Sequence, residues 1–153
     1  MDLILWRHAE AEDDFELGGD LARRLTGKGE KQAARMAAWL DRQLPDGARI
    51  YASPAVRTEQ TVVTLGRKYR LKDELAPHGT PDQLLQLVQW PDAKGATLVV
   101  GHQPALGRVI AQLLGLSETE CAVRKGALWW LRRRERDGVP QTVVVTVQTP
   151  ELL

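Results

Sequence analysis

The alternation of short apolar runs with longer amphipathic segments constrains the fold of this chain more than any other feature. Three short segments, 3–6, 49–52 and 97–101, have the length of strands, and the first and last of them are apolar runs. A segment with helical periodicity follows each of them, and strands that alternate with helices form a largely parallel sheet covered on both faces. We therefore expect an α/β fold, a three-layer αβα sandwich around a mainly parallel central sheet.

Residues that commonly start helices precede each amphipathic segment. A capping hydroxyl satisfies free N–H groups of the first turn, and proline fits the first helical positions because it lacks an N–H. These signals predict helices over 26–44, 53–69 and 80–89, and a fourth from 104 onward. The residues that mark these starts are Thr26, Ser53-Pro54, Thr80-Pro81 and Pro104.

The C-terminal part of the chain departs from this alternation. Two further apolar runs, 127–131 and 142–147, flank an Asp-Gly pair at 137–138, which is typical of a tight hairpin turn. The central sheet should therefore become antiparallel near a C-terminal hairpin. Trp129 and Trp130 are adjacent in the first of these strands, so they should face opposite sides of the sheet as packing residues.

Length and composition exclude several classes of protein. A chain of 153 residues fits one domain spanning 1–153, and its net charge of +1 leaves no basic footprint for nucleic acid or for a membrane surface. Cys121 is the single cysteine, so no internal disulfide can form. Neither a signal peptide nor a transmembrane segment is visible in the sequence, which makes the cytoplasm the expected compartment.

Two histidines and an arginine follow predicted parallel strands. Arg7-His8 comes directly after the first apolar run, and His102 follows Gly101 at the end of a later one. Ligands of open α/β sheets bind at the carboxyl ends of the strands, so these side chains should meet in one pocket. Cationic donors beside an imidazole nucleophile suit phosphoryl transfer.

A second arginine is expected to reach the same pocket. Arg57 lies on the first turn of the helix predicted from Ser53-Pro54, where free backbone N–H groups and the helix dipole attract phosphate. Its guanidinium is a forked donor suited to two phosphate oxygens. Gln60 and Thr61 share its helical face and should line the pocket or brace Arg57.

The order of these motifs resembles the histidine phosphatase superfamily (phosphoglycerate mutase-like), and in particular its small SixA-type phosphohistidine phosphatases. Nearly the whole chain takes part in the resemblance. The residues that carry it are Arg7-His8-Ala9, then Asp20, Arg23, Leu25-Thr26 and Gly29, then Ser53 to Thr61, and finally Val100 to Pro104.

The resemblance implies a role for each of these side chains. His8 would attack phosphorus and carry the phosphoryl group as a phosphohistidine intermediate, while Arg7, Arg57 and a cationic His102 hold the oxygens. A neutral imidazole whose other ring N–H is held by a backbone carbonyl is a competent nucleophile near neutral pH. Arg23 would reach phosphate or a partner protein, or else is an ordinary loop arginine. No metal ion or other cofactor is required.

The chain departs from larger members of the superfamily, which carry an acidic proton donor on an inserted segment. The equivalent stretch, 71–81, is short, and Glu74 is its best acid by position, whereas His78 is more typical of a surface loop. An imidazole leaving group needs no such donor because a protonated phosphohistidine ring departs neutral. The substrate is therefore expected to be phosphohistidine on a phosphotransfer or phosphocarrier protein.

Other functions remain open at this point. The chain could be a phosphatase for a small phosphorylated metabolite, a mutase-like enzyme, or a phosphoprotein-binding module without turnover. A metal hydrolase would instead combine His8 and His102 with acidic residues of the loop that follows the first strand. Those acidic residues are Glu10, Glu12, Asp13, Asp14 and Glu16.

Overall fold

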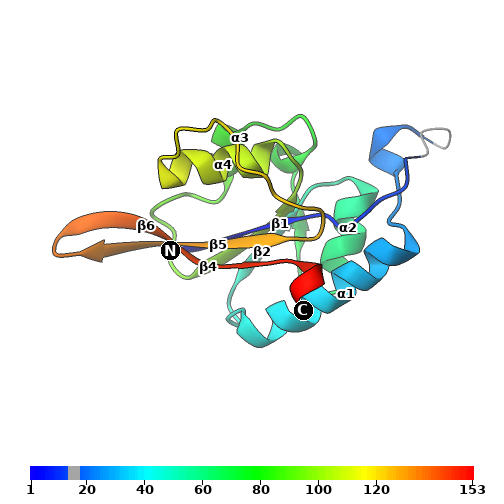
Figure 1. The fold of residues 1–153 in the computed structure, drawn as a ribbon, viewed down its shortest axis with the longest axis horizontal. Helices are drawn as coiled ribbons and strands as arrows, with labels where there is room; N and C mark the ends of the chain where they lie inside the picture. The colour runs from blue at the N-terminus through cyan, green and yellow to red at the C-terminus, as the bar shows by residue number, and fades with distance from the viewer. Residues whose placement is uncertain (14–17) are drawn as a thin grey trace.

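The computed structural model describes residues 1–13 and 18–153. In this part of the chain a six-stranded sheet has the order β3-β2-β4-β1-β5-β6 (Figure 1). The strands are β1 (Asp2–Arg7), β2 (Arg49–Ala52), β3 (Arg70–Leu71), β4 (Ala96–Gly101), β5 (Leu128–Arg136) and β6 (Val139–Gln148). The helices are α1 (Gly27–Gln43), α2 (Val56–Val63), α3 (Pro81–Leu87) and α4 (Ala105–Leu114), with short 3-10 helices η1 (Asp20–Ala22), η2 (Asp73–Leu75) and η3 (Pro150–Leu152).

The sheet is parallel in its centre and antiparallel at one edge. Strand β4 pairs in parallel with both β1 and β2, and β2 pairs in parallel with β3. Strand β5 runs antiparallel to β1, and β6 runs antiparallel to β5. The expected α/β fold with a C-terminal antiparallel hairpin is therefore confirmed.

Two hydrophobic cores separate the three layers. Side chains of β1 alternate, so Ile4 and Trp6 pack toward α1 and α2, whereas Leu3 and Leu5 pack toward α3 and α4 (Figure 1). Strand β4 is buried along its whole length because helices cover both faces of the sheet. No helix in the described part of the chain has the length and apolar character needed to cross a bilayer.

The helix starts follow the predicted signals at two of the four positions. Thr26 caps α1 by accepting a hydrogen bond from the Gly29 N–H at 2.9 Å, and Thr80 forms a capping box with Gln83. In α4 the capping position is Pro104, and the helix itself starts one residue later.

The predicted extent of the second helix is wrong at both ends. Helix α2 covers Val56–Val63 with Ala55 as its capping residue, rather than 53–69. Ser53 stays in the extended connection, where its hydroxyl accepts a hydrogen bond from the Ala55 N–H. Beyond the helix, Gly66 has a positive φ of 72°, which turns the chain toward the short edge strand β3.

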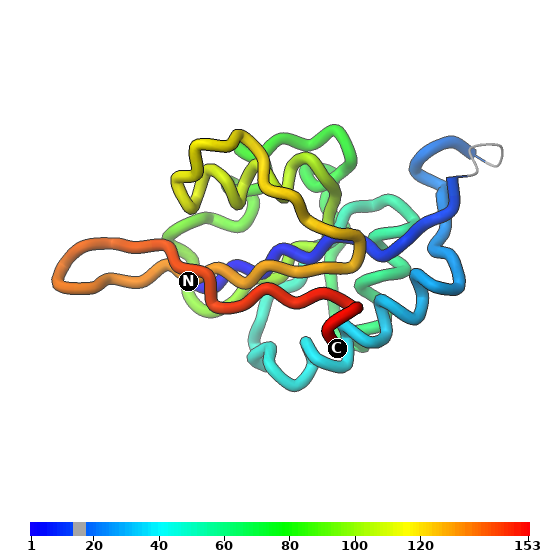
Figure 2. The backbone as a smooth tube through the Cα atoms, in the orientation of Figure 1, coloured from blue at the N-terminus to red at the C-terminus, as the bar shows by residue number. Residues whose placement is uncertain are grey.

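The C-terminal hairpin is longer than its apolar runs suggested. Its turn residues Asp137 and Gly138 both have positive φ, as tight hairpin turns require. The far end of the hairpin extends beyond the helices (Figure 2), so apolar residues are not needed there and the hydrophobic pattern underestimates its length. Trp129 and Trp130 pack on opposite sides of the sheet, as expected.

Gly29 allows α1 to lie against the loop that follows β1, and we expect Gly29→Ala to destabilise the protein. A Cβ at this position would collide with the backbone carbonyl of Glu10. Overpacking of this kind costs about 2–3 kcal/mol, which denaturant unfolding can measure. The matched control is Gly27→Ala in the same helix, whose added Cβ meets nothing within 4 Å. Equal effects of the two variants would contradict this interpretation.

Candidate active site

Parallel pairing of β1 with β4 brings the two histidines together. Arg7 lies opposite Gly101 in the register of these strands, and the His8 N–H donates to the Gly101 carbonyl at 3.2 Å. The His8 and His102 rings consequently lie with their centroids 5.3 Å apart. On the other side of β4, the Ser53 N–H donates to the Val100 carbonyl at 3.0 Å, which brings the start of α2 to the same edge. The predicted convergence at the carboxyl ends of the strands is therefore present.

His8 is a buried, neutral imidazole, and its Nε2 has no hydrogen-bond partner among the described residues. Its side chain is 5% exposed, and Nδ1 lies 2.7 Å from the Ala9 carbonyl oxygen. A carbonyl can only accept, so Nδ1 carries the proton and Nε2 keeps its lone pair. Burial, and then the charges of Arg57 and Arg7, lower the pKa of His8 to about 4. The expected imidazole held by a backbone carbonyl is present.

His102 lies between a guanidinium and a hydroxyl. Arg57 Nη2 lies 3.3 Å from its Nδ1, and the Ser53 hydroxyl lies 2.8 Å from its Nε2. Since arginine can only donate, Nδ1 is the acceptor and Nε2 carries the proton. Burial, followed by the charge of Arg57, lowers the pKa of His102 to about 3. The expectation of a cationic His102 is thus wrong for the free protein, because a buried imidazole beside an arginine does not hold a second proton.

Arg7 and Arg57 each have a buried N–H group without a partner among the described residues. Arg57 is 4% exposed, and Arg7 donates from Nη1 to the Val123 carbonyl at 2.9 Å. The Nε atoms of both side chains are buried and have no hydrogen-bond partner among the described residues. Burial, followed by the charge of Arg57, lowers the pKa of Arg7. Buried donors of this kind are normally paired, so these two indicate a site for an anionic acceptor.

Asp20 connects two arginines at the edge of the pocket. Its backbone carbonyl accepts from Arg57 Nη1 at 2.8 Å, and its carboxylate contacts Arg57 Nη2 at 3.1 Å and Arg23 Nη1 at 3.0 Å. Burial acts to raise the pKa of Asp20, but the hydrogen bonds from Arg23 and Arg57 outweigh it and lower the pKa. Asp20 stays ionised and is not a proton donor at neutral pH. In the sequence, Asp20 is recognisable only as part of the motif shared with the superfamily.

Arg23 lies on the loop before α1, as expected, and is held by its own neighbours. Its Nε donates to the Glu12 carbonyl at 2.6 Å, and its terminal nitrogens contact the carboxylates of Asp20 and Asp13. The positive charge of Arg23 contributes to lowering the pKa of His8, so it acts electrostatically on the site.

The two polar residues predicted beside Arg57 have different positions. Thr61 donates to the Arg57 carbonyl at 2.8 Å and accepts from the Ala9 N–H at 3.1 Å, so it fastens the loop after β1 to α2. Gln60 instead accepts from the Leu25 N–H at 2.8 Å and braces the loop before α1. None of these three hydrogen bonds involves the Arg57 guanidinium.

The remaining candidates are Glu74, His78 and the acidic residues of the loop that follows β1. Among the described residues, Glu74 has no hydrogen bond or salt bridge to either histidine or to Arg7 or Arg57, and His78 is exposed. Of the acidic loop residues weighed as metal ligands, Asp14 and Glu16 lie outside the described residues. Within the described ranges, no group of three or more histidine, cysteine or carboxylate side chains has a metal-binding arrangement.

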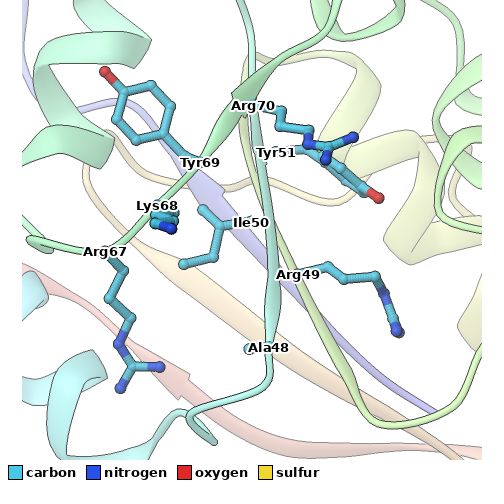
Figure 3. A pocket seen from close by; sticks show the side chains of 8 residues that line it. All are labelled: Ala48, Arg49, Ile50, Tyr51, Arg67, Lys68, Tyr69 and Arg70. Atoms are coloured by element: carbon cyan, nitrogen blue, oxygen red, sulfur yellow. The ribbon is translucent and has the colours of Figure 1, made fainter.

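A cationic groove of about 740 Å³ lies away from the two histidines, at the β2–β3 edge of the sheet. Figure 3 shows that its Arg67 and Arg70 side chains point in different directions. Arg67 also donates to the Asp41 carboxylate, and Arg49 donates to the Thr97 hydroxyl. The cations of this groove therefore do not converge on one acceptor, unlike those around His8.

Comparison with known proteins identifies the family to which the chain belongs. The sequence model of the histidine phosphatase superfamily (branch 1) matches residues 3–78. Phosphohistidine phosphatase SixA of Escherichia coli (strain K12) is 31% identical over 121 residues, which cover 74% of this chain and 74% of that protein. The chain belongs to the histidine phosphatase superfamily, and it is a phosphatase.

Within the superfamily, the chain resembles SixA proteins over most of its length. A SixA homolog from Haemophilus influenzae is 29% identical over 130 residues, which cover 75% of this chain and 78% of that protein. The solved structure of SixA complexed with tungstate superposes with a TM-score of 0.82 at 25% identity, and it covers 99% of each chain. The resemblance inferred from the motifs is therefore confirmed.

Proposed function

We propose that the protein is a metal-independent phosphatase that hydrolyses phosphohistidine on a protein through a phosphohistidine intermediate at His8. The observation that carries the proposal is the pair of buried Nε–H groups of Arg7 and Arg57, which have no partner among the described residues and whose charges act on the neutral imidazole of His8. Guanidinium donors aimed at a developing phosphoryl charge supply electrostatic stabilisation without a metal ion. The unprotonated Nε2 of His8 supplies the nucleophile.

The first step transfers the phosphoryl group to the enzyme. His8 Nε2 forms a bond to phosphorus while the bond from phosphorus to the substrate nitrogen breaks, and the electron pair of that bond returns to the substrate ring. The substrate imidazole departs neutral because its other nitrogen already carries a proton. Arg7 and Arg57 hold the phosphoryl oxygens during this exchange.

The second step regenerates the enzyme. Water attacks phosphorus, the Nε2–phosphorus bond breaks, and its electron pair returns to His8 as a neutral imidazole. Both protons of the water stay with the inorganic phosphate. The Nδ1–H of His8 remains bonded to the Ala9 carbonyl throughout, which keeps the nucleophilic nitrogen facing the phosphoryl group.

Phosphohistidine is favoured as the substrate because the described residues include no acid that is hydrogen-bonded to His8 or His102. Glu74 has no described hydrogen bond or salt bridge to the site residues, and Asp20 is kept ionised by two arginines. An alkoxide leaving group would need a delivered proton, whereas a protonated phosphohistidine ring does not. The names of the SixA relatives agree with this choice.

The test is a substrate panel run with the wild-type protein in the presence and absence of a chelator. We expect the highest kcat/KM on a phosphohistidine protein, lower values on sugar phosphates, and no loss of turnover with the chelator. Preference for sugar phosphates would favour a phosphatase of small metabolites instead. Activity that is lost with the chelator and restored by a divalent ion would overturn metal independence.

The lowered pKa of His8 predicts the acid side of the pH profile. Protonation of Nε2 removes the nucleophile, so kcat/KM should fall only as the pH drops through about 4, the pKa of His8 in the free protein. An ordinary histidine would lose activity near pH 6.5. The profile is best measured with an aryl phosphate and corrected for titration of the substrate. An enzyme group that titrates near pH 6.5 would contradict the neutral, buried state of His8.

A further inference from the structure

The pair Asp20–Arg57 has a geometry that the reaction described above does not use. Asp20 contacts both terminal nitrogens of Arg57, Nη1 through its backbone carbonyl and Nη2 through its carboxylate. Among the described residues, its carboxylate is the one that forms a salt bridge with Arg57. The side of the guanidinium that carries Nη1 and Nη2 is thus already occupied.

The adjacent edge of the same guanidinium, formed by Nε and Nη2, includes the contact to His102. Nε has no described partner, and Nη2 also donates to His102 Nδ1 at 3.3 Å. Guanidinium N–H groups are fixed in one plane, so a partner on the terminal nitrogens sets where Nε points. A phosphoryl group that bridges Nε and Nη2 would replace the bond to His102 and leave the bonds to Asp20 in place.

We propose that Asp20 is a positioning residue, which clamps the terminal nitrogens of Arg57 so that its Nε edge is presented to the phosphoryl group beside His8 and His102. This inference rests on the proposed function and assigns to Asp20 a role that acts through Arg57. The contact to Arg23 supports it, because a carboxylate between two guanidinium groups offsets their mutual repulsion and keeps both near the pocket.

Asp20 can be replaced without changing a side chain of the hydrophobic core. The side chain of Asp20 is 43% exposed, whereas that of Arg57 is 4% exposed. Removing the carboxylate leaves the Nη1 bond to the backbone carbonyl in place but takes away the contact that orients Nη2, so the buried guanidinium is held at one terminal nitrogen instead of two. Displacements of about 1 Å at a reacting centre cost about 10²-fold in rate, so we expect Asp20→Ala to lower kcat/KM about 10- to 100-fold. Asp20→Asn can satisfy only one of the two arginines and should fall between.

A double-mutant cycle with Arg57→Ala tests whether Asp20 acts through Arg57. The loss from Asp20→Ala should shrink to less than about two-fold when Arg57 is already alanine, because coupled residues are not additive. A general loosening of the structure would lower kcat/KM equally in both backgrounds, and that result would overturn the proposal. No loss from Asp20→Ala in the otherwise wild-type protein would also overturn it.

The matched control is Asp13→Ala. Asp13 also forms a salt bridge with Arg23, at 3.3 Å, but its side chain is 94% exposed and it has no described contact with Arg57. We expect kcat/KM to stay within two-fold of wild type, and a loss as large as that of Asp20→Ala would contradict a specific clamp on Arg57.

A second readout separates this inference from the proposed function. The dissociation constant of inorganic phosphate, measured by calorimetry, should rise about ten-fold in Asp20→Ala. In the Arg57→Ala background, adding Asp20→Ala should leave this constant unchanged. If the wild-type protein binds phosphate but turns over no phosphorylated substrate, the proposed function fails while the cycle on phosphate binding still tests Asp20. If it turns over substrate and both cycles are additive, the role of Asp20 fails alone.

Discussion

Replacing His8 with alanine is expected to abolish turnover, with a loss in kcat of at least about 10⁴-fold. No other imidazole can substitute for it, because the His102 nitrogens are directed at Arg57 and Ser53 rather than free. When it is incubated with a substrate whose phosphoryl group is radiolabelled, the variant should also fail to become labelled. The measurement is the amount of acid-labile label on the denatured protein. The wild-type protein should carry that label on His8.

The matched control is His78→Ala, which removes an exposed histidine from a loop. It should keep wild-type kcat and wild-type labelling. Residual turnover of His8→Ala at more than about one per cent of wild type would rule out nucleophilic catalysis by this residue and favour direct attack of water.

Arg57→Ala is expected to lower kcat/KM by about 10²- to 10⁴-fold, comparable to the loss of an oriented oxyanion donor. The change removes the buried Nε–H and the Nη2–H that faces His102, and it leaves Asp20 without its salt bridge to this position. Arg57→Lys keeps the positive charge but loses the planar fork, so it should recover only part of the activity. Steady-state kinetics on the preferred substrate measures all three proteins.

Arg67→Ala is the control for this prediction. Arg67 is also partly buried and paired with a carboxylate, that of Asp41, but it lies in the groove at the β2–β3 edge. Its removal should leave kcat/KM within two-fold of wild type. An equal loss in Arg57→Ala and Arg67→Ala would indicate that both act on stability, and it would exclude a specific role of Arg57 in binding the phosphoryl group.

Several predictions that depend on local signals agree with the structure, although the Ser53-Pro54 signal is an exception because α2 starts at Val56. The cap at Thr26, the capping box at Thr80 and the place of Arg57 on the first turn of α2 each depend on residues within one helical turn. The end of α2 was mispredicted because a propensity pattern does not register the positive φ of Gly66. The edge strand β3 was missed because a two-residue strand has no periodicity to detect.

The protonation states of the site residues could not be predicted from local sequence patterns. The sequence does not show whether His102 is exposed or buried, and so it does not show whether its imidazole is protonated. Folding buries it against Arg57 and Ser53, and that burial lowers its pKa to about 3. Asp20 illustrates the same limit, since its bond to Arg57 joins residues 37 positions apart in the chain.

Hydrophobic periodicity and helix caps are properties of neighbouring residues, so the α/β order of elements can be predicted without a structure. The superfamily motifs and the side chains available for phosphoryl transfer can likewise be read from the chain. The folded structure is needed to know which nitrogen of His8 and of His102 carries the proton, which carboxylate holds Arg57, and which N–H groups of Arg7 and Arg57 lack partners among the described residues. These properties depend on burial and on contacts between distant segments, and such contacts exist only once β1, β4 and β2 lie side by side.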